Sequence, residues 1–208
     1  MLEVPQAILF DFDGVLADTE PLHWQCWSEV LRPLGVAITW KDYQAHCIGI
    51  SDRQFLEELG RLADPPRQVD ELLPAYPLKQ KLFHAGSLNG KLVPEEVKIW
   101  IQTKRSVPVG VVTSSAASEI APILQIEGLL PFLSTVVYGD DVAKLKPDPE
   151  PYLTAMKRLG VKSALVLEDS VAGVASARAA GCEVLQIQDP REVAGRLRAR
   201  LGAFVNFR

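Results

Sequence analysis

The chain of 208 residues has few cysteines and no long hydrophobic run, and each shortage excludes a class of protein. Its three cysteines are scattered and lack metal-ligand spacing, so we expect no disulfide framework and a reducing compartment. No apolar stretch approaches the ~20 residues that a membrane-spanning helix needs. The first five residues carry an acid and no basic region, which is unlike a secretory signal. We therefore expect a cytoplasmic protein without a membrane partner.

An excess of positive charge is also missing. The formal net charge is -4 and the pI is about 5.5, so composition gives no basic footprint for nucleic acid. The C-terminal segment is locally basic, through Arg191, Arg196, Arg198 and Arg200. Their helical spacing favours a solvated helix face over a binding patch. We expect no nucleic-acid partner, and a monomer is the default expectation.

What the sequence does contain is a series of short apolar runs, each followed by polar residues. The runs are continuous and rich in β-branched residues, as in strands buried on both faces of a parallel sheet. We place strands at residues 7–10, 109–112, 135–138, 164–167 and 183–187. Helical patterns lie between them at residues 117–126, 149–159 and 171–180. This alternation predicts an α/β fold with a doubly wound, Rossmann-like parallel sheet, which binds ligands beyond the carboxyl ends of its strands.

One segment breaks the alternation of strands and helices. Residues 18–89 contain no convincing strand, and helical patterns lie at residues 23–34, 40–46, 52–62 and 78–83. We therefore predict an inserted all-helical cap domain over residues 18–89. Residues 1–17 and 90–208 then form the catalytic core.

Two aspartates follow the first predicted strand directly. Asp11 and Asp13 are spaced i and i+2, so both carboxylates can project to the same side as the strand enters its loop. Their mutual repulsion favours a bound cation or a proton. In isolation the same pair before a glycine is equally typical of a turn. The pair is therefore a candidate for chemistry only in combination with other residues.

Further polar residues stand near the ends of later predicted strands, namely Thr113, Ser114, Lys146, Glu168 and Asp169. Taken singly, the hydroxyls are typical of a helix cap, the lysine of a solvated loop, and the two acids of a helix start. However, the carboxyl ends of parallel strands meet at one edge of a sheet. Together these residues would supply a nucleophile, a neighbouring acid, a hydroxyl donor, a cation and metal carboxylates.

The order of these residues resembles the four motifs of the haloacid dehalogenase superfamily. It resembles in particular the branch with an α-helical cap, which includes β-phosphoglucomutase and phosphoglycolate phosphatase. The matching segments are Asp-Phe-Asp-Gly-Val-Leu-Ala-Asp-Thr at 11–19, Val-Val-Thr-Ser at 111–114, Lys-Pro at 146–147, and Leu-Glu-Asp-Ser-Val-Ala-Gly at 167–173. The resemblance extends from about residue 6 to residue 190.

The resemblance implies that the substrate is a small phosphate ester and that the reaction passes through an aspartyl phosphate on Asp11. Asp13 would protonate the leaving oxygen and then deprotonate the incoming nucleophile. Thr113, Lys146 and the Ser114 amide would hold the phosphate. True dehalogenases of the superfamily lack the second aspartate, so the presence of Asp13 argues against dehalogenation.

The resemblance also implies Mg²⁺ as the cofactor. Its ligands would be the Asp11 carboxylate, the Asp13 backbone carbonyl and Asp169, with Glu168 in or near the ligand shell. The sequence does not distinguish Mg²⁺ from Mn²⁺.

In the predicted cap, Thr19 matches a hinge threonine of the family. His23 and Trp27 match a His-xxx-Trp motif of the sugar-phosphate members, but their i, i+4 spacing fits a core-packing face equally well. Gly49 and Ser51 match the Gly-x-Ser loop of substrate specificity. We therefore expect Thr19, His23, Gly49 and Ser51 to contribute to substrate binding.

The sequence departs from the mutase pattern at the position after this loop. The mutase has an arginine there that grips a second phosphate, whereas this chain has Asp52, followed by Arg53. Lys79 matches the mutase's cap lysine, although solvated helix lysines are common. The mutase's extra lysine after the second motif is replaced by Ala116. Arg53 and Lys79 remain candidate substrate-binding residues.

We therefore predict a Mg²⁺-dependent phosphatase of small phosphorylated metabolites, with sugar phosphates foremost. The alternative is a β-phosphoglucomutase-type transfer. A more remote alternative is a non-enzymatic signalling module that accepts a phosphoryl group on an aspartate. Such a module needs neither Asp13 nor a helical cap, and it usually fits within one domain of about 120 residues.

Overall fold

The computed structural model describes residues 4–48, 50, 52–88, 92–103 and 107–202. The chain divides into two compact units. The first, here called the core unit, comprises Met1–Asp18 and Lys91–Arg208, and the second, the helical unit, comprises Thr19–Gly90. The sequence predicts these divisions one residue earlier, after residues 17 and 89.

The core unit contains a five-stranded parallel sheet with strand order β3-β2-β1-β4-β5. The strands are β1 (Ile8–Phe10), β2 (Val109–Val112), β3 (Thr135–Val137), β4 (Leu165–Glu168) and β5 (Glu183–Gln186). Every residue of β1, β2 and β4 is buried, whereas the edge strands β3 and β5 are partly exposed. The predicted doubly wound α/β fold is confirmed.

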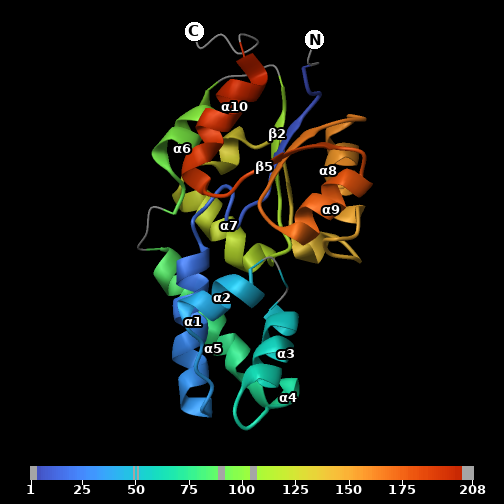
Figure 1. Ribbon diagram of the computed structural model, residues 1–208. Coiled ribbons are helices and arrows are strands. Elements are labelled where there is room, and N and C mark those ends of the chain that lie inside the picture. The colour runs from blue at the N-terminus through green and yellow to red at the C-terminus, as the bar shows by residue number, and fades with distance from the viewer. Residues whose placement is uncertain (1–3, 49, 51, 89–91, 104–106, 203–208) are drawn as a thin grey trace. The chain divides into compact units, whose positions relative to one another are not determined.

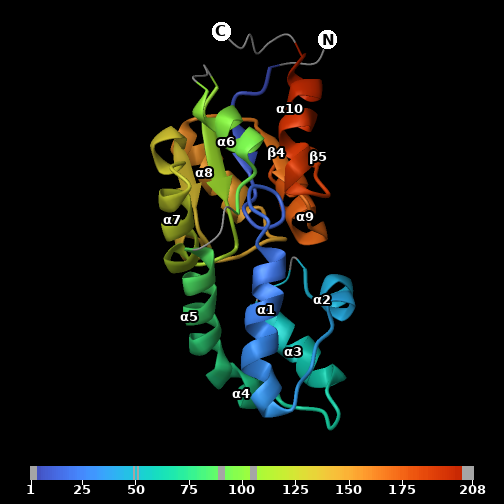
Figure 2. The same cartoon turned by 90° about the vertical axis from the view of Figure 1, so that its left-hand side faces the viewer.

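Helices cover both faces of this sheet. They are α6 (Glu95–Gln102), α7 (Ala117–Ile126), α8 (Glu150–Leu159), α9 (Val171–Ala179) and α10 (Val193–Leu201). Helices α6, α7 and α10 lie on one face, and α8 and α9 lie on the other (Figures 1 and 2). This division follows from right-handed crossovers, because the chain steps from β1 to β3 in one direction and then returns past β1 to β4 and β5. Short 3₁₀ turns complete the unit at Leu130–Phe132, Gly139–Asp141 and Pro190–Glu192.

Helix α6 was absent from the sequence prediction. It begins after Pro94 and buries Val97, Trp100 and Ile101, which share one face at i, i+3 and i+4. The Trp100 ring meets Phe10 of β1 edge-on, with ring centroids 5.8 Å apart. This contact packs the helix on the central strand.

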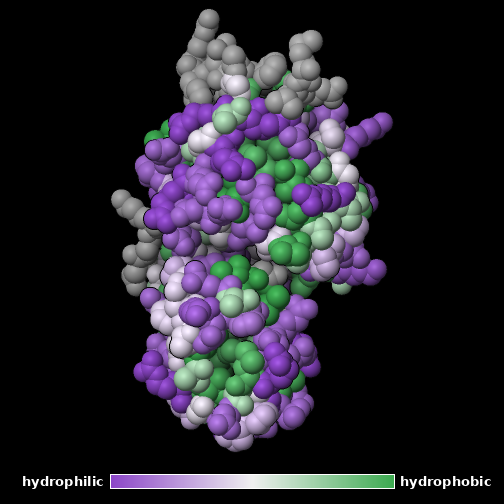
Figure 3. Space-filling view, viewed as in Figure 1, coloured by the Kyte–Doolittle hydropathy of each residue, from purple (hydrophilic) through white to green (hydrophobic). Residues whose placement is uncertain are grey.

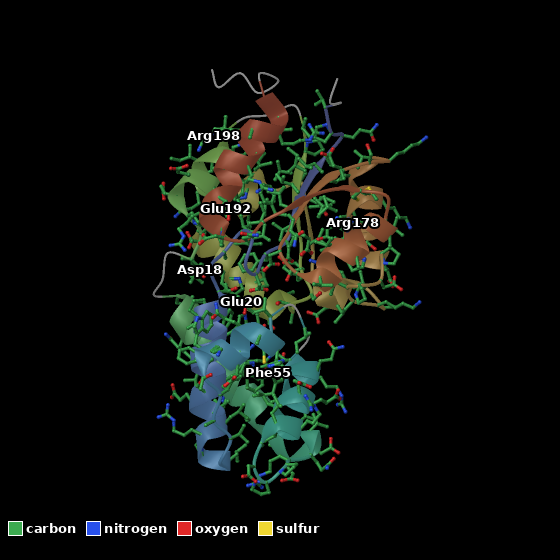
Figure 4. All side chains as sticks on the ribbon, in the orientation of Figure 1. Asp18, Glu20, Phe55, Arg178, Glu192 and Arg198 are labelled. Atoms are coloured by element: carbon green, nitrogen blue, oxygen red, sulfur yellow. The ribbon has the colours of Figure 1, made fainter. Side chains whose placement is uncertain are left out.

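The helical unit contains no strand among its described residues. Its helices are α1 (Glu20–Leu31), α2 (Trp40–His46), α3 (Asp52–Leu62), α4 (Val69–Leu72) and α5 (Tyr76–Ser87), with 3₁₀ turns at Arg32–Leu34 and Leu73–Ala75. Its core is aromatic, and Phe55 of α3, labelled in Figure 4, lies 4.8 Å from Trp27 of α1 between ring centroids. Helix α5 extends beyond its predicted range because Pro77 suits a first helical turn.

No helix in the described ranges has both the length and the apolar character that crossing a membrane requires.

The basic C-terminal segment forms a salt-bridged helix surface. Arg198, labelled in Figure 4, donates to Glu96 at 2.8 Å, and Arg200 donates to Glu183 at 2.5 Å. Arg196 donates to the Gln186 carbonyl at 3.1 Å, and Arg191 pairs with Asp189. The surface over α6 and α10 is mainly hydrophilic (Figure 3). These contacts are those of a solvated helix face.

Candidate active site

The sheet places four of the predicted site residues at its carboxyl edge. Asp11 follows β1, Thr113 follows β2, Glu168 ends β4 and Asp169 follows it. The ladder continues one residue beyond the strands, because the Asp11 amide donates to the Leu167 carbonyl at 2.9 Å and the Thr113 amide to the Val137 carbonyl at 2.9 Å. Asp11 is central because β1 lies between β2 and β4.

Lys146 reaches this edge from the loop before α8. Its Nζ lies 2.6 Å from Asp11 Oδ1, 2.6 Å from Glu168 Oε1 and 3.0 Å from the Val112 carbonyl. The side chain is only 5% exposed. Burial lowers the pKa of Lys146, but the carboxylates of Asp11 and Glu168 outweigh burial, so the pKa is raised above its ordinary value. Lys146 is therefore a fixed positive charge beside Asp11.

Negative charge exceeds positive charge around Asp11. Burial raises the pKa of this carboxyl well above its ordinary range, and the Glu168 carboxylate raises it further. Lys146 opposes these effects, while Asp169 and Asp13 add to them. Among the described residues, four carboxylates thus act on one another around the ammonium group of Lys146. Such a cluster favours a bound cation.

Glu168 is fully buried, and both of its carboxylate oxygens accept hydrogen bonds. Oε1 accepts from Lys146 at 2.6 Å and from the Tyr152 hydroxyl at 2.6 Å. Oε2 accepts from the Asp169 amide at 3.2 Å and from the Ser170 amide and hydroxyl at 3.4 and 3.2 Å. The Ser170 hydroxyl also caps α9 by accepting from the Gly173 amide at 3.0 Å. Glu168 is thereby fixed as the partner that orients Lys146.

The sequence prediction did not include Tyr152. The residue lies on α8 and is fully buried, and its ring centroid is 5.1 Å from Lys146 Nζ. Burial raises the pKa of its hydroxyl well above the ordinary value, and the Glu168 carboxylate raises it further, so the hydroxyl remains a donor. In the sequence Tyr152 reads as a core position of an amphipathic helix. The one signal that could have identified Tyr152 is that a tyrosine hydroxyl in a buried position needs a hydrogen-bond partner.

Three carboxylates at this edge are spaced to hold a metal ion. Oxygen atoms of Asp11, Glu168 and Asp169 lie within 4.8 Å of one another. Oxygen ligands suit Mg²⁺ and other hard cations. The space beside Asp169 depends on Gly14, which has φ of +73°, because a Cβ there would lie 2.1 Å from Asp169 Oδ2. The donor set and this close approach fit a divalent cation.

Asp13 lies in the loop after β1, and its carboxylate contacts the hydroxyl-bearing segment that follows the neighbouring strand β2. Ser115 Oγ donates to Asp13 Oδ2 at 2.9 Å. Thr113 is 1% exposed, and its Oγ1 accepts from the Ser115 amide at 3.0 Å. Ser114 is exposed. Sequence reasoning missed Ser115, although it continues the Thr-Ser-Ser run that follows β2.

The remaining predicted site residues belong to the helical unit. The Thr19 carbonyl accepts from the His23 amide at 3.0 Å at the start of α1, and the Thr19 side chain is buried. The His23 ring stacks on Phe83 of α5 at 4.0 Å between centroids. This stacking is the core-packing contact that the spacing of His23 and Trp27 allowed. Gly49 and Ser51 lie outside the described residues.

The two candidate cations of the helical unit are paired with acids. Lys79 is fully buried, and its Nζ lies 3.2 Å from Asp52 Oδ2. The Asp52 carboxylate also accepts from the Trp27 indole at 3.2 Å. Arg53 is exposed and donates to Glu57 at 3.2 Å within α3. The aspartate that replaces the mutase's arginine is thus the partner of Lys79.

Comparison with known proteins relates the whole arrangement to one family. The model of the haloacid dehalogenase-like hydrolase family matches residues 8–187. A phosphorylated carbohydrates phosphatase of Thermotoga maritima is 30% identical over 180 residues, covering 86% of this chain and 82% of its own. Fructose-1-phosphate phosphatase YqaB of Escherichia coli is 30% identical over 197 residues, covering 90% and 99%. The solved structure of CbbY from Rhodobacter sphaeroides in complex with phosphate has a TM-score of 0.74 at 26% identity, covering 88% of this chain and 86% of that one.

Proposed function

The chain belongs to the haloacid dehalogenase-like hydrolase family, as its motifs predicted, and from this premise we propose that it is a Mg²⁺-dependent phosphatase of sugar monophosphates. The observation that carries the proposal is the position of Asp11 at the central strand end, 2.6 Å from Lys146. A buried carboxylate oriented by a fixed cation is arranged as a nucleophile. Its neighbours supply the other groups that phosphoryl transfer requires.

In the proposed reaction, an Asp11 carboxylate oxygen attacks phosphorus and the bond from phosphorus to the sugar oxygen breaks. Asp13 gives its proton to that oxygen, which leaves as an alcohol. A water molecule then attacks the aspartyl phosphate and transfers a proton to Asp13. The bond between phosphorus and Asp11 breaks, which releases inorganic phosphate and restores both carboxyl groups.

The residues around Asp11 would hold the phosphate and balance its charge. Phosphoryl transfer depends mainly on positioning and on neutralising negative charge. Lys146 is fixed by Asp11 and Glu168 and would face the transferring group. The Thr113 hydroxyl and the Ser114 amide would contribute further donors. Thr113 is already positioned at the end of β2 by the Val137 carbonyl.

Asp11, Asp169 and the Asp13 backbone carbonyl would hold Mg²⁺. When bound, the ion supplies positive charge next to the phosphate and the surrounding carboxylates. Both oxygens of Glu168 accept hydrogen bonds from protein donors, so we place Glu168 beside the ligand shell, where it orients Lys146. This assignment agrees with the excess of carboxylates around Asp11.

The helical unit favours a phosphatase over a mutase. A mutase must hold a second phosphate, for which Arg53 and Lys79 were the candidate cations. Lys79 is buried in an ion pair with Asp52, and Arg53 is paired with Glu57. The relatives from Thermotoga maritima and Escherichia coli are named as phosphatases of phosphorylated carbohydrates and of fructose 1-phosphate. A sugar with a single phosphate is therefore the substrate class we propose.

The test is release of inorganic phosphate from a panel of sugar monophosphates, in Mg²⁺ and in chelator. Wild type is compared with Asp11→Asn and with Asp70→Asn, which changes an exposed aspartate of the helical unit. We expect Mg²⁺-dependent release by wild type and Asp70→Asn, and none by Asp11→Asn.

Other outcomes would replace the proposal. Isomerisation of β-glucose 1-phosphate without phosphate release would establish the mutase. Stoichiometric phosphorylation without turnover would favour the signalling module. Equal release by Asp11→Asn and wild type would refute the role of Asp11.

A further inference from the structure

Ser115 is held in place by its own backbone. It stands three residues after β2 ends at Val112. Its amide donates to Thr113 Oγ1 at 3.0 Å, and its carbonyl accepts from the Gly139 amide at 2.9 Å. Gly139 allows this approach, because a Cβ there would lie 2.3 Å from the Ser114 carbonyl oxygen. The Ser115 hydroxyl is therefore presented from a fixed position.

The backbone of Asp13 is fixed from the other side. The loop after β1 closes on itself through an isolated bridge between Asp13 and Ala17, and the Gly14 amide donates to the Ala17 carbonyl at 2.9 Å. The Ser115 hydroxyl, 102 residues away in the chain, donates to Asp13 Oδ2 at 2.9 Å. A hydrogen bond to one carboxylate oxygen restrains the rotation of the Asp13 carboxyl group about its side-chain bonds.

We propose that Ser115 is a positioning residue that orients the Asp13 carboxyl group for proton transfer to the leaving oxygen. The inference rests on the proposed function, in which Asp13 is the general acid. Proton transfer requires the acid to lie within hydrogen-bond reach of the departing atom, so rotation of the carboxyl group determines its efficiency. The bonds that form and break in the proposed reaction are unchanged, because Ser115 keeps its own proton throughout.

Two substrates with different leaving groups distinguish this positioning role of Ser115 from a merely structural role. A sugar leaves as an alkoxide, which is strongly basic and needs the proton from Asp13 as the bond breaks. A 2,4-dinitrophenolate is stable without a proton and does not need the acid. The value of kcat/KM reports the steps up to departure of this group, so it isolates the event in which Asp13 donates.

The experiment compares kcat/KM on the fastest sugar monophosphate of the panel with kcat/KM on 2,4-dinitrophenyl phosphate. The variants are Ser115→Ala, Ser115→Thr, Asp13→Asn and the control Ser118→Ala, which changes an exposed serine of α7. We expect Ser115→Ala to lose about 10-fold to 100-fold on the sugar phosphate and less than about threefold on the aryl ester. Asp13→Asn should show the same selectivity with a larger loss, and Ser115→Thr should recover most activity because it keeps the hydroxyl.

Two results would overturn the role of Ser115 while leaving the proposed function intact. One is an equal loss on both substrates, which indicates general damage to the site, and the other is no loss on either. Absence of turnover by wild type on both esters would instead overturn the proposed function, and this inference with it.

Discussion

The core unit and the helical unit each contain a lysine whose side chain is buried, and the two are surrounded differently. Lys146 of the core unit contacts two carboxylates, Asp11 and Glu168, at 2.6 Å each. Lys79 of the helical unit contacts the Asp52 carboxylate at 3.2 Å. Three aromatic rings also lie near Lys79, with ring centroids 5.5, 5.8 and 5.2 Å from Nζ at Trp27, Tyr76 and Phe83.

The difference lies in the balance of charge. The pair of Lys79 and Asp52 is neutral overall, and rings stabilise the ammonium group by cation–π attraction. Around Lys146 the carboxylates outnumber the cation, which destabilises the ion-free site and favours binding of positive charge. We infer that the cluster around Lys146, in which carboxylates exceed the cation, is the reactive site. The neutral pair of Lys79 and Asp52, here called the balanced pair, instead maintains packing and keeps Lys79 from binding a second anion.

The largest expected effect is that of removing the core lysine. Lys146→Met should lower kcat for phosphate release by at least about 10³-fold, because Asp11 loses the cation that orients it. The control is Lys144→Met in the same loop, whose side chain is 72% exposed and which should remain near wild type. Steady-state kinetics on one sugar monophosphate measures both. A loss of less than tenfold for Lys146→Met would contradict the comparison.

A smaller but still large effect is expected where the carboxylate cluster approaches the backbone. Gly14→Ala should abolish stabilisation by Mg²⁺. The new Cβ would lie 2.1 Å from Asp169 Oδ2, so the Asp169 carboxylate would have to move. The control is Gly181→Ala, which has a similar φ of +79° but no atom within 4 Å of the new Cβ. Both variants carry the left-handed backbone penalty of about 1 kcal/mol. The difference between their responses to Mg²⁺ therefore reports the displacement of the Asp169 carboxylate.

Thermal unfolding with and without Mg²⁺ measures this difference. Wild type and Gly181→Ala should gain about 2.7 kcal/mol in Mg²⁺ at 100 times Kd. Equal stabilisation of Gly14→Ala would show that the ion binds elsewhere.

The balanced pair should behave differently when it is broken. Asp52→Asn leaves the fully buried Lys79 without its carboxylate and should lower the free energy of unfolding by about 1–3 kcal/mol. Adding Lys79→Met to it should restore part of that loss, because an apolar side chain suits the aromatic surroundings. Urea denaturation of both single variants and the double variant gives the coupling energy. Additive effects would mean that the two residues do not act as a pair.

Tyr152→Phe should have a modest effect on the core cluster. It removes the 2.6 Å hydrogen bond to Glu168 but leaves the bond from Lys146 to the same oxygen. We expect a loss of about 1–2 kcal/mol in unfolding free energy and a fall in kcat of about threefold to tenfold. Urea denaturation and initial rates measure the two quantities. Unchanged kinetics would show that Glu168 does not need Tyr152 to hold Lys146.

The smallest effect concerns two of the three thiols, Cys47 in the helical unit and Cys182 in the core unit. Burial raises the pKa of Cys47 from about 9 to about 12 in the helical unit, and that of Cys182 to about 11 in the core unit. Because both folded-state values lie above the unfolded value, their contribution to stability is present below pH 9 and declines as pH rises toward 11 to 12. Urea midpoints between pH 8 and pH 10.5 for Cys47→Ala and Cys182→Ala should show a shallower decline than wild type. Parallel declines would contradict this.

The sequence predicted the elements whose signal is local. Each buried strand of a parallel sheet is a continuous apolar run, and such strands end at one edge, so Asp11, Thr113 and Asp169 could be grouped before their coordinates were known. Helix α6 was not predicted, although Val97, Trp100 and Ile101 give it an apolar face at helical spacing. Helix α4 was missed because its 4 residues are little more than one turn, which is too short for an apolar repeat.

Contacts between distant residues could not be predicted in this way. The bonds from Ser115 to Asp13, from Lys79 to Asp52 and from Tyr152 to Glu168 join residues 102, 27 and 16 positions apart. Each depends on how separate elements pack, and one sequence contains no pattern for such pairs. The stacking of His23 on Phe83 likewise depends on the packing of α1 against α5.

Trapping of the covalent intermediate tests the central claim most directly. Wild type is mixed with a sugar monophosphate and Mg²⁺, quenched within one turnover and treated with borohydride, which reduces an aspartyl phosphate to homoserine. Peptide mass spectrometry then locates the modified residue. We predict homoserine at position 11 in wild type, with none in Asp11→Asn. Turnover with no modification at Asp11, or with modification of another carboxylate, would contradict the assignment of Asp11 as the nucleophile.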